Sequence, residues 1–471
     1  MNNKLKNVLV NSGYAIFSNL LSMFVSTLVI LVLPKLIGVE SYGYWQLYLF
    51  YVSYVGFFHF GWIDGIYLKY GGSHFEDLDE RKFYSQFVMY ILFQSVIAFL
   101  IFIYGLVYTT DSDKQFIFEQ LGITLLLTNV RFFIIYILQT TNRIKQSSAI
   151  TILDRFLYAV LLIGFILVDI NHYQMMIYVD VLARFMSLLY GLYLCRSILC
   201  KNLSYFKLDY FEVIDNIKVG SNLMLSNVAS LLIIGTVRLG IERQWDIATF
   251  GKVSLTLSIS NLMMIFINAV GIVIFPMLKR LERGKLSILY TSLRNVLMPF
   301  MLGILLLYYP LKLVLVNWLP HYMESIKYMV LIFPMAIYEG KMSLLINTYL
   351  KALRMEKYIL RVNIRTVCLS LVLTLLTTVV FKNLDLAIVS IVVLLAFRCI
   401  VAEQAVAREL EIHVKSDIYF EVLLTMVFIV AGWFLPPMIA IILYIVCYGV
   451  YLWMKKASLH ATVRNLKQSL S

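Results

Sequence analysis

Long apolar segments alternate with short polar connections along the whole chain. A helix needs roughly 20 mainly apolar residues to cross the hydrocarbon core of a bilayer, and about fourteen segments of this kind follow one another here. The connections between them are too short to hold a soluble domain. The pattern therefore predicts an all-α, polytopic membrane protein.

The predicted spans can be given by residue number. The first half contains those near residues 13–33, 42–60, 83–108, 116–138, 156–168 with its flanks, and 173–194. A cationic linker covers residues 196–218. The second half contains those near residues 221–240, 250–275, 296–309, 326–350, 359–380, 386–407, 419–435 and 438–454.

Most Lys and Arg residues lie in alternate connections. Examples are Arg81 after the second span, Arg143 after the fourth and Arg354 after the tenth. Connections on the opposite side, such as residues 111–114 and 436–437, are shorter and poorer in these residues. Cytoplasmic loops of membrane proteins are enriched in Lys and Arg. We therefore predict that the cationic side is the cytoplasm and that both termini lie there.

The composition agrees with a membrane protein. Hydrophobic residues make up 61% of the chain and charged residues 14%, whereas a soluble domain is roughly half apolar and a quarter charged. Cationic loops account for the net charge of +13 better than a nucleic-acid partner does. The five cysteines stand singly, in no spacing typical of disulfides or zinc. We therefore expect no nucleic-acid partner and no metal.

An internal repeat relates the first two spans to the seventh and eighth. When the two pairs are aligned, Asn19 coincides with Asn227 and Ser22 with Ser230. In each first helix the small and polar positions fall on one stripe, which should face protein or water rather than lipid. Repeats of this kind are typical of transporters.

The repeat predicts two six-helix lobes followed by two extra helices. The N-terminal lobe covers residues 1–195, the cytoplasmic linker 196–218 and the C-terminal lobe 219–410. Residues 411–471 form the two further transmembrane helices and a cytoplasmic tail. We expect a substrate to bind between the lobes and to be moved by alternating access.

Charged side chains within the spans are candidates for function, because each costs about 2.5–3.5 kcal/mol at the bilayer centre and must face protein or water. Arg131 shares a polar stripe with Thr128 and Asn142. This cation suits an anionic headgroup, or equally a structural pair with a carboxylate on a neighbouring helix. Asp180 and Arg184 are four residues apart, a spacing that lets them neutralise each other.

Glu339 and Lys341 follow Pro334 in the tenth span. Two residues apart on a helix, they point in different directions, so neither simply neutralises the other. Because a carboxylate in a low dielectric can exchange protons near neutral pH, this pair is our first candidate for coupling, against a structural role. Weaker candidates of the same kind, more often interfacial or paired, are Arg398 with Glu403 and Asp64 with His59.

Two segments of the sequence resemble a known family. Residues 33–72 follow a polar-faced first helix and read LPKLIGVESYGYWQLYLFYVSYVGFFHFGWIDGIYLKYGG. Residues 240–280 read GIERQWDIATFGKVSLTLSISNLMMIFINAVGIVIFPMLKR. These patterns resemble the polysaccharide transporter family, the Wzx-type flippases for O-antigen, capsule and exopolysaccharide. That family belongs to the multidrug/oligosaccharidyl-lipid/polysaccharide flippase superfamily.

The resemblance implies two six-helix lobes around a cationic cavity. It implies a flippase that moves undecaprenyl-pyrophosphate-linked oligosaccharide across the bacterial cytoplasmic (inner) membrane, with Arg131 and Arg238 lining the cavity. The expected substrate-binding residues are Arg131, Arg238, Asn19, Asn227, Arg184 and Arg398. Many such flippases have twelve helices rather than fourteen, which leaves the subclass open.

No cofactor is expected, and coupling to protons or sodium stays open. The expected coupling residues are Glu339, Lys341, Asp180 and Asp64. Besides membrane lipids, a polysaccharide polymerase and a chain-length regulator are the expected partners. Which sugars form the substrate does not follow from the sequence.

The chain is not expected to be an enzyme. A saccharide polymerase or ligase of the same pathway would carry a long external loop with catalytic residues, and no predicted external loop is long enough. A glycosyltransferase would need metal-binding acids in a sizeable loop, whereas the acids of residues 76–80 lie among basic residues and favour a solvated loop. A small-molecule exporter of the same fold is the remaining alternative, and the excess of cations within the spans argues mildly against it.

Overall fold

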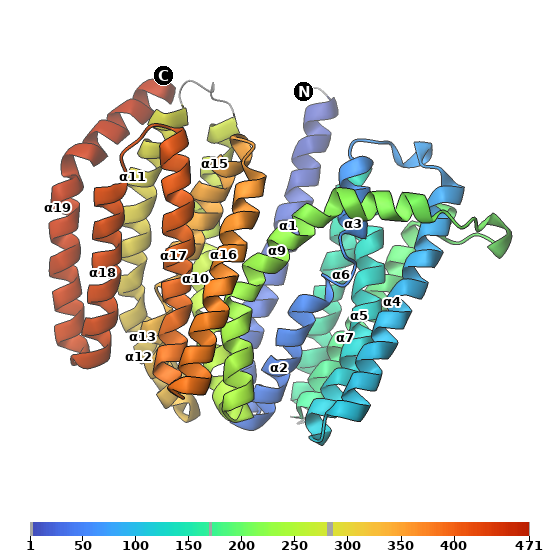
Figure 1. The fold of residues 1–471 in the computed structure, drawn as a ribbon, viewed down its shortest axis with the longest axis horizontal. Helices are drawn as coiled ribbons and strands as arrows, with labels where there is room; N and C mark the ends of the chain where they lie inside the picture. The colour runs from blue at the N-terminus through green and yellow to red at the C-terminus, as the bar shows by residue number, and fades with distance from the viewer. Residues whose placement is uncertain (1–2, 169–171, 280–285, 471) are drawn as a thin grey trace. The chain divides into compact units, whose positions relative to one another are not determined.

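The computed structural model describes residues 3–168, 172–279 and 286–470. The described chain consists of helices and their connections, without a strand (Figure 1). The predicted all-α fold is therefore confirmed. The chain divides into two compact units, residues 1–228 and 229–471.

The first unit contains seven long or medium helices and the start of an eighth. They are α1 (Asn3–Leu36), α2 (Val39–Val55), α3 (Trp62–Lys69), α4 (Glu80–Tyr108), α5 (Ser112–Thr140), α6 (Ile144–Leu167), α7 (Tyr173–Leu194) and α9 (Tyr210–Gln244). Shorter turns are η1 (Phe75–Asp77), α8 (Arg196–Leu199) and η2 (Leu203–Tyr205). The central helix is α5, which packs against α2, α3, α4, α6 and α7. Its most apolar stretch is 78% buried, against 17% for α4, so polar residues on α5 lie inside the unit.

The second predicted span does not continue to residue 60 as one helix. It ends at Val55, and Phe60 and Gly61 adopt positive φ angles of 51° and 87° before α3 begins. The carbonyl of Val55 accepts from Asn129 Nδ2 at 3.0 Å, and that of Phe58 accepts from Gln94 Nε2 at 3.1 Å. An interruption of a helix within a membrane protein requires such side-chain donors, because lipid cannot form hydrogen bonds with the exposed backbone groups.

The segment predicted as a linker packs on the first unit. Gly65 of α3 lies so close to α9 that an added Cβ would stand 1.9 Å from the Asn216 carbonyl oxygen. A Cβ on Gly220 would stand 2.0 Å from the Gly61 carbonyl oxygen. Only glycine permits this approach of two backbones. The division between the units accordingly falls within α9, after the predicted linker.

The second unit contains the remaining helices. They are α10 (Ile247–Lys279), α11 (Leu286–Ile304), α12 (Tyr308–Trp318), α13 (Met323–Ile332), α14 (Met335–Lys341), α15 (Asn347–Ala352), α16 (Glu356–Thr374), α17 (Leu384–Glu409), α18 (Lys415–Phe434) and α19 (Pro437–Leu470). Short turns are η4 (Leu305–Leu307), η5 (Pro320–Tyr322), η6 (Met342–Ile346) and η7 (Leu375–Val380). Helices α18 and α19 pack on α13 and α11. The two extra helices are thus part of this unit.

The chain bends by 43° between α13 and α14, at Pro334. Proline has no N–H group and disrupts the helix before it. The π-helical turn η6 follows directly after Lys341. The tenth predicted span is therefore a broken helix, with Glu339 and Lys341 in its second part.

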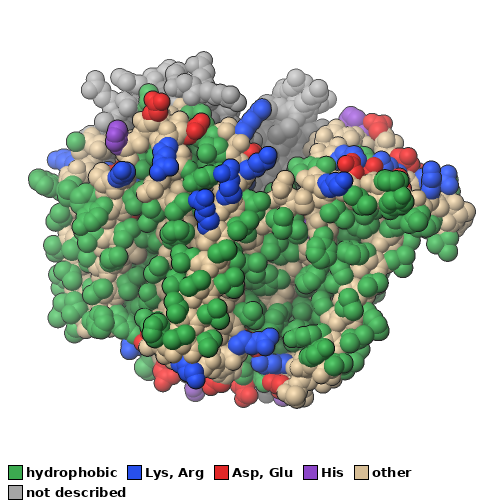
Figure 2. Space-filling view, viewed as in Figure 1, with side chains coloured by type: hydrophobic (Ala, Val, Ile, Leu, Met, Phe, Trp, Pro, Cys, Tyr) green, Lys and Arg blue, Asp and Glu red, His purple; other side chains and the backbone are tan. Residues whose placement is uncertain are grey.

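Eleven helices of the described chain are long and apolar enough to cross a membrane, or twelve if the bent pair counts as one span. The sequence predicts about fourteen. The two predicted spans that are not among these twelve correspond to α2, which has only 17 residues, and to α10. Figure 2 shows hydrophobic side chains over the middle of the helices, with charged side chains mostly near their ends. This is the surface of a multi-pass membrane protein.

Candidate charge sites

Arg131, on the central helix α5, is paired with a carboxylate of α6. Its Nη1 lies 2.8 Å from Asp154 Oδ2, and the two side chains are 6% and 5% exposed. The same Nη1 donates to Ser187 Oγ at 3.2 Å. The structure thus contains the ion pair between Arg131 and a carboxylate of a neighbouring helix, which the sequence analysis gave as the alternative to binding a headgroup.

Arg184 and Asp180 of α7 form the ion pair that their spacing predicts, with Nε 2.8 Å from Oδ2, and this prediction is confirmed. Arg184 also donates to Thr128 on α5 at 2.9 Å, and the Tyr48 hydroxyl of α2 donates to Asp180 at 2.7 Å. A buried charge is stable when it is paired and hydrogen-bonded. Three helices meet at this pair.

Asp64 of α3 has a different kind of partner. Its Oδ2 lies 3.8 Å from His59 Nε2, and both residues are buried. The Gly61 N–H donates to His59 Nδ1 at 2.9 Å, so Nδ1 acts as the acceptor and Nε2 carries the proton of the neutral ring.

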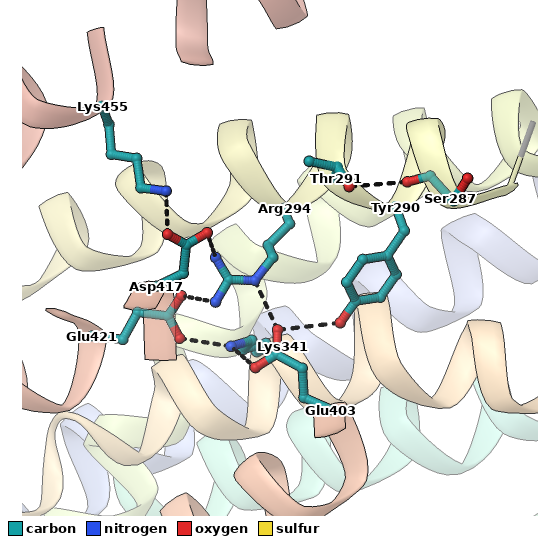
Figure 3. Close-up of polar contacts among 9 residues, drawn as sticks. All are labelled: Ser287, Tyr290, Thr291, Arg294, Lys341, Glu403, Asp417, Glu421 and Lys455. Carbon is teal, nitrogen blue, oxygen red and sulfur yellow. Dashed lines mark hydrogen bonds and ion pairs between the residues drawn. The ribbon is translucent and has the colours of Figure 1, made fainter. Parts of the chain in front are cut away.

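Six charged side chains form a network in the second unit (Figure 3). Arg294 of α11 is at its centre: Nε lies 2.8 Å from Glu403, Nη1 2.7 Å from Asp417 and Nη2 2.5 Å from Glu421. Lys341 bridges Glu403 and Glu421 at 2.5 and 2.6 Å. Lys455 of α19 pairs with Asp417.

The network is electrically balanced, with the bases Arg294, Lys341 and Lys455 against the acids Glu403, Asp417 and Glu421. It connects α11, α14, α17, α18 and α19. Sequence reasoning missed Arg294 and Asp417, because the predicted spans began at residues 296 and 419. It also missed Glu421, although this residue lies inside the predicted span 419–435 and its charge there was the available signal.

Glu339 lies apart from this network, and Arg398 of α17 is its partner. Arg398 Nη1 is 3.1 Å from Glu339 Oε1; the arginine side chain is 4% exposed and the glutamate side chain 26%. Arg398 also donates to Asn363 Oδ1 and Ser230 Oγ, each at 2.9 Å. Glu339 and Lys341 therefore have separate partners, as their spacing predicts.

The other candidates take different positions. Arg238 is half-buried, donates to Ser254 Oγ at 3.0 Å and lies over the Phe250 ring. Asn19 and Asn227 are exposed. Within the described residues no group of three or more His, Cys, Asp or Glu side chains is arranged to hold a metal ion.

The fold is similar to that of solved transporters of the MOP superfamily. One is the lipid II flippase MurJ in an inward closed conformation, with a TM-score of 0.65 and 13% identity, covering 96% of this chain and 99% of that one.

Another is an inward-facing multidrug resistance transporter of the MATE family, with a TM-score of 0.61 and 13% identity, covering 83% and 94% of the two chains. A MATE transporter in complex with MaD5 has a TM-score of 0.51 and 12% identity, covering 84% and 94%. No protein-family model matches the sequence, and no curated protein matches it. The superfamily fold implied by the resemblance is confirmed, and membership of the polysaccharide transporter family stays a prediction.

Proposed function

We propose that this protein is a flippase for undecaprenyl-pyrophosphate-linked oligosaccharide in the bacterial cytoplasmic membrane, with both termini in the cytoplasm. It moves repeat units outward by alternating access, for O-antigen, capsule or exopolysaccharide synthesis. The observation that carries the proposal is the likeness to the lipid II flippase over 96% of this chain. Likeness to the MATE transporter covers 83%, so the match to a carrier of lipid-linked saccharide is the more complete.

To bind a diphosphate, an arginine must be able to exchange its carboxylate partner for a phosphate group. Arg131 and Arg184 are held by buried aspartates, and Arg294 is held by three carboxylates. Arg398 differs because its partner Glu339 is partly exposed. An exposed carboxylate keeps part of its hydration when displaced, so an incoming phosphate replaces it at lower cost. We assign the diphosphate to Arg398, with Arg238 as the second cation.

Displacement of Glu339 gives a route to coupling. Substrate binding to Arg398 separates the Glu339 carboxylate from its cation, and substrate release restores the pair. The separated carboxylate is the group that a coupling cation would neutralise. Asp180 and Lys341 are less suited, because buried opposite charges hold them.

The test is exposure of newly made lipid-linked saccharide to a membrane-impermeant reagent, in vesicles with and without the protein, under an imposed proton gradient. Arg398→Gln should reduce protein-dependent exposure about tenfold or more, since it removes charge-assisted hydrogen bonds. The control is Arg408→Gln on α17, which removes an exposed arginine of the same helix outside the predicted span. Unchanged exposure in the Arg398→Gln vesicles would rule out the assigned site, and absence of exposure with the native protein would rule out flipping.

Export of a small molecule is the second candidate, favoured by the TM-score of 0.61 to the MATE transporter. The same vesicles distinguish it. An exporter would deplete a fluorescent cationic drug from the loaded compartment without exposing saccharide, whereas a flippase would expose saccharide and leave the drug in place.

A further inference from the structure

Residues 203–218, which we call the surface segment, expose several large apolar side chains outside the predicted spans. The exposed fractions are 78% for Leu203, 66% for Leu208, 69% for Phe211 and 44% for Ile214. By contrast, residues 76–81, in another connection on the same predicted side, expose mainly charged side chains. A loop surrounded by water does not usually gather apolar groups of this size.

The opposite side of the surface segment is fixed to the first unit. Val213 and Ile217 pack on its hydrophobic core. Asn216 is fully buried and donates to Gln86 Oε1 at 2.7 Å. The Lys207 backbone N–H donates to Ser85 Oγ at 2.9 Å. The outward direction of Leu208 and Phe211 is therefore set by packing.

The acids of the surface segment have partners, whereas two of its cations are exposed. Glu212 pairs with Lys69 at 3.0 Å, the partly exposed Asp215 pairs with Lys69 at 2.5 Å, and Asp209 caps the start of α9 by accepting from the Glu212 N–H. Lys207 and Lys218 are exposed. Phe211, Ile214 and Lys218 follow the helical spacing that places them on one face of α9.

We propose that the surface segment is an interfacial anchor for anionic phospholipid. Leu203, Leu208 and Phe211 enter the boundary between headgroups and acyl chains, and Lys207 and Lys218 contact headgroup phosphates. In Figure 1 the connection before α9 projects outward beside the start of α4, at the end of the spans rather than along them. Apolar side chains flanked by lysines are the composition of elements that lie in this boundary.

The anchor can be tested with spin labels on the full chain in nanodiscs. Cys200, Cys368 and Cys447 are replaced by serine, since they are exposed or half-buried. A nitroxide is then placed through Leu208→Cys or Phe211→Cys, with Asp77→Cys as the control at an exposed position of the charged connection 76–81. Collisions with oxygen report lipid, and collisions with a water-soluble nickel chelate report water.

The oxygen-to-nickel ratio should be several times higher at positions 208 and 211 than at 77, and it should rise further when phosphatidylglycerol replaces phosphatidylcholine. Lys207→Gln with Lys218→Gln should remove that rise while leaving protein yield and Tm unchanged. Ratios equal to the one at position 77 in both lipids would overturn the anchor. Protection from both reagents would also overturn it, because it would mean that another protein surface covers the segment.

Discussion

The two units hold their final elements by different means. In the first, the segment before and at the start of α9 is attached by close backbone contact at Gly65 and Gly220. In the second, α18 and α19 are attached through a balanced charge network around Arg294. Buried charges of the first unit form separate pairs instead, such as Arg131 with Asp154. The backbone contact leaves no space for an added side-chain atom, whereas the charge network becomes unbalanced when one charged residue is removed.

The largest effect should come from the centre of the network. Arg294→Ala leaves Glu403, Asp417 and Glu421 with fewer cations than carboxylates, and should destabilise the protein by about 3–5 kcal/mol. The measurement is Tm in detergent, with Arg365→Ala as the control. If both variants melted at the same temperature, the network would not stabilise the second unit.

A separate pair should be easier to replace. Arg131→Met alone leaves the buried Asp154 with only the more distant Arg155, at 3.8 Å, and should cost about 3 kcal/mol. The double variant Arg131→Met with Asp154→Leu should recover most of that loss, because well-packed apolar residues often replace a buried pair. Tm values of the two single variants and the double variant measure the recovery. No recovery would mean that this pair, too, depends on further charges.

The glycine contact should be sensitive to a single methyl group. Gly65→Ala forces α3 and α9 apart and should cost about 1–3 kcal/mol. The matched control is Gly13→Ala, where an added Cβ would meet nothing within 4 Å. Limited proteolysis between α8 and α9 would show whether the segment detaches. Equal Tm and equal cleavage for both variants would contradict the tight contact.

The smallest effect should come from an exposed pair. A backbone hydrogen bond and the Arg143 guanidinium hold the pKa of Glu76 below its usual range. A lowered folded-state pKa stabilises the fold at pH values above the unfolded pKa, and this contribution is lost as the pH falls. Because the pair is exposed and screened, Glu76→Gln should leave Tm unchanged between pH 7 and 5. A clear fall in Tm at pH 7 would indicate that exposed pairs matter as much as buried ones.

Local spacing predicted those features that depend on one helix. The apolar segments gave the helices, four-residue spacing gave the Asp180–Arg184 pair, and two-residue spacing gave the separate partners of Glu339 and Lys341. The partner of Arg131 could not be predicted, because Asp154 lies on another helix and the rotation of each helix is set by packing. Asp154 lies in the flank of the predicted fifth span, residues 156–168, and was not among the candidates.

The interruption between α2 and α3 could not be predicted from the sequence for a related reason. Residues 55–61 are mainly apolar and continue the hydropathy of the span. The side chains that satisfy the broken backbone, Gln94 and Asn129, come from α4 and α5. Such long-range compensation is not visible in the pattern of a single segment.

The charge network also has a consequence for the order of synthesis. Arg294 and Lys341 leave the ribosome well before Asp417 and Glu421, and at that stage Glu403 is the nearest of their acidic partners to follow. Until α18 is inserted, Glu403 of α17 is the one acid of the network that faces these two cations, so one positive charge stays without a carboxylate. Glu421 and Asp417 of α18 supply the missing negative charge, and Lys455 of α19 then balances Asp417. Completion of the second unit therefore depends on its last two helices.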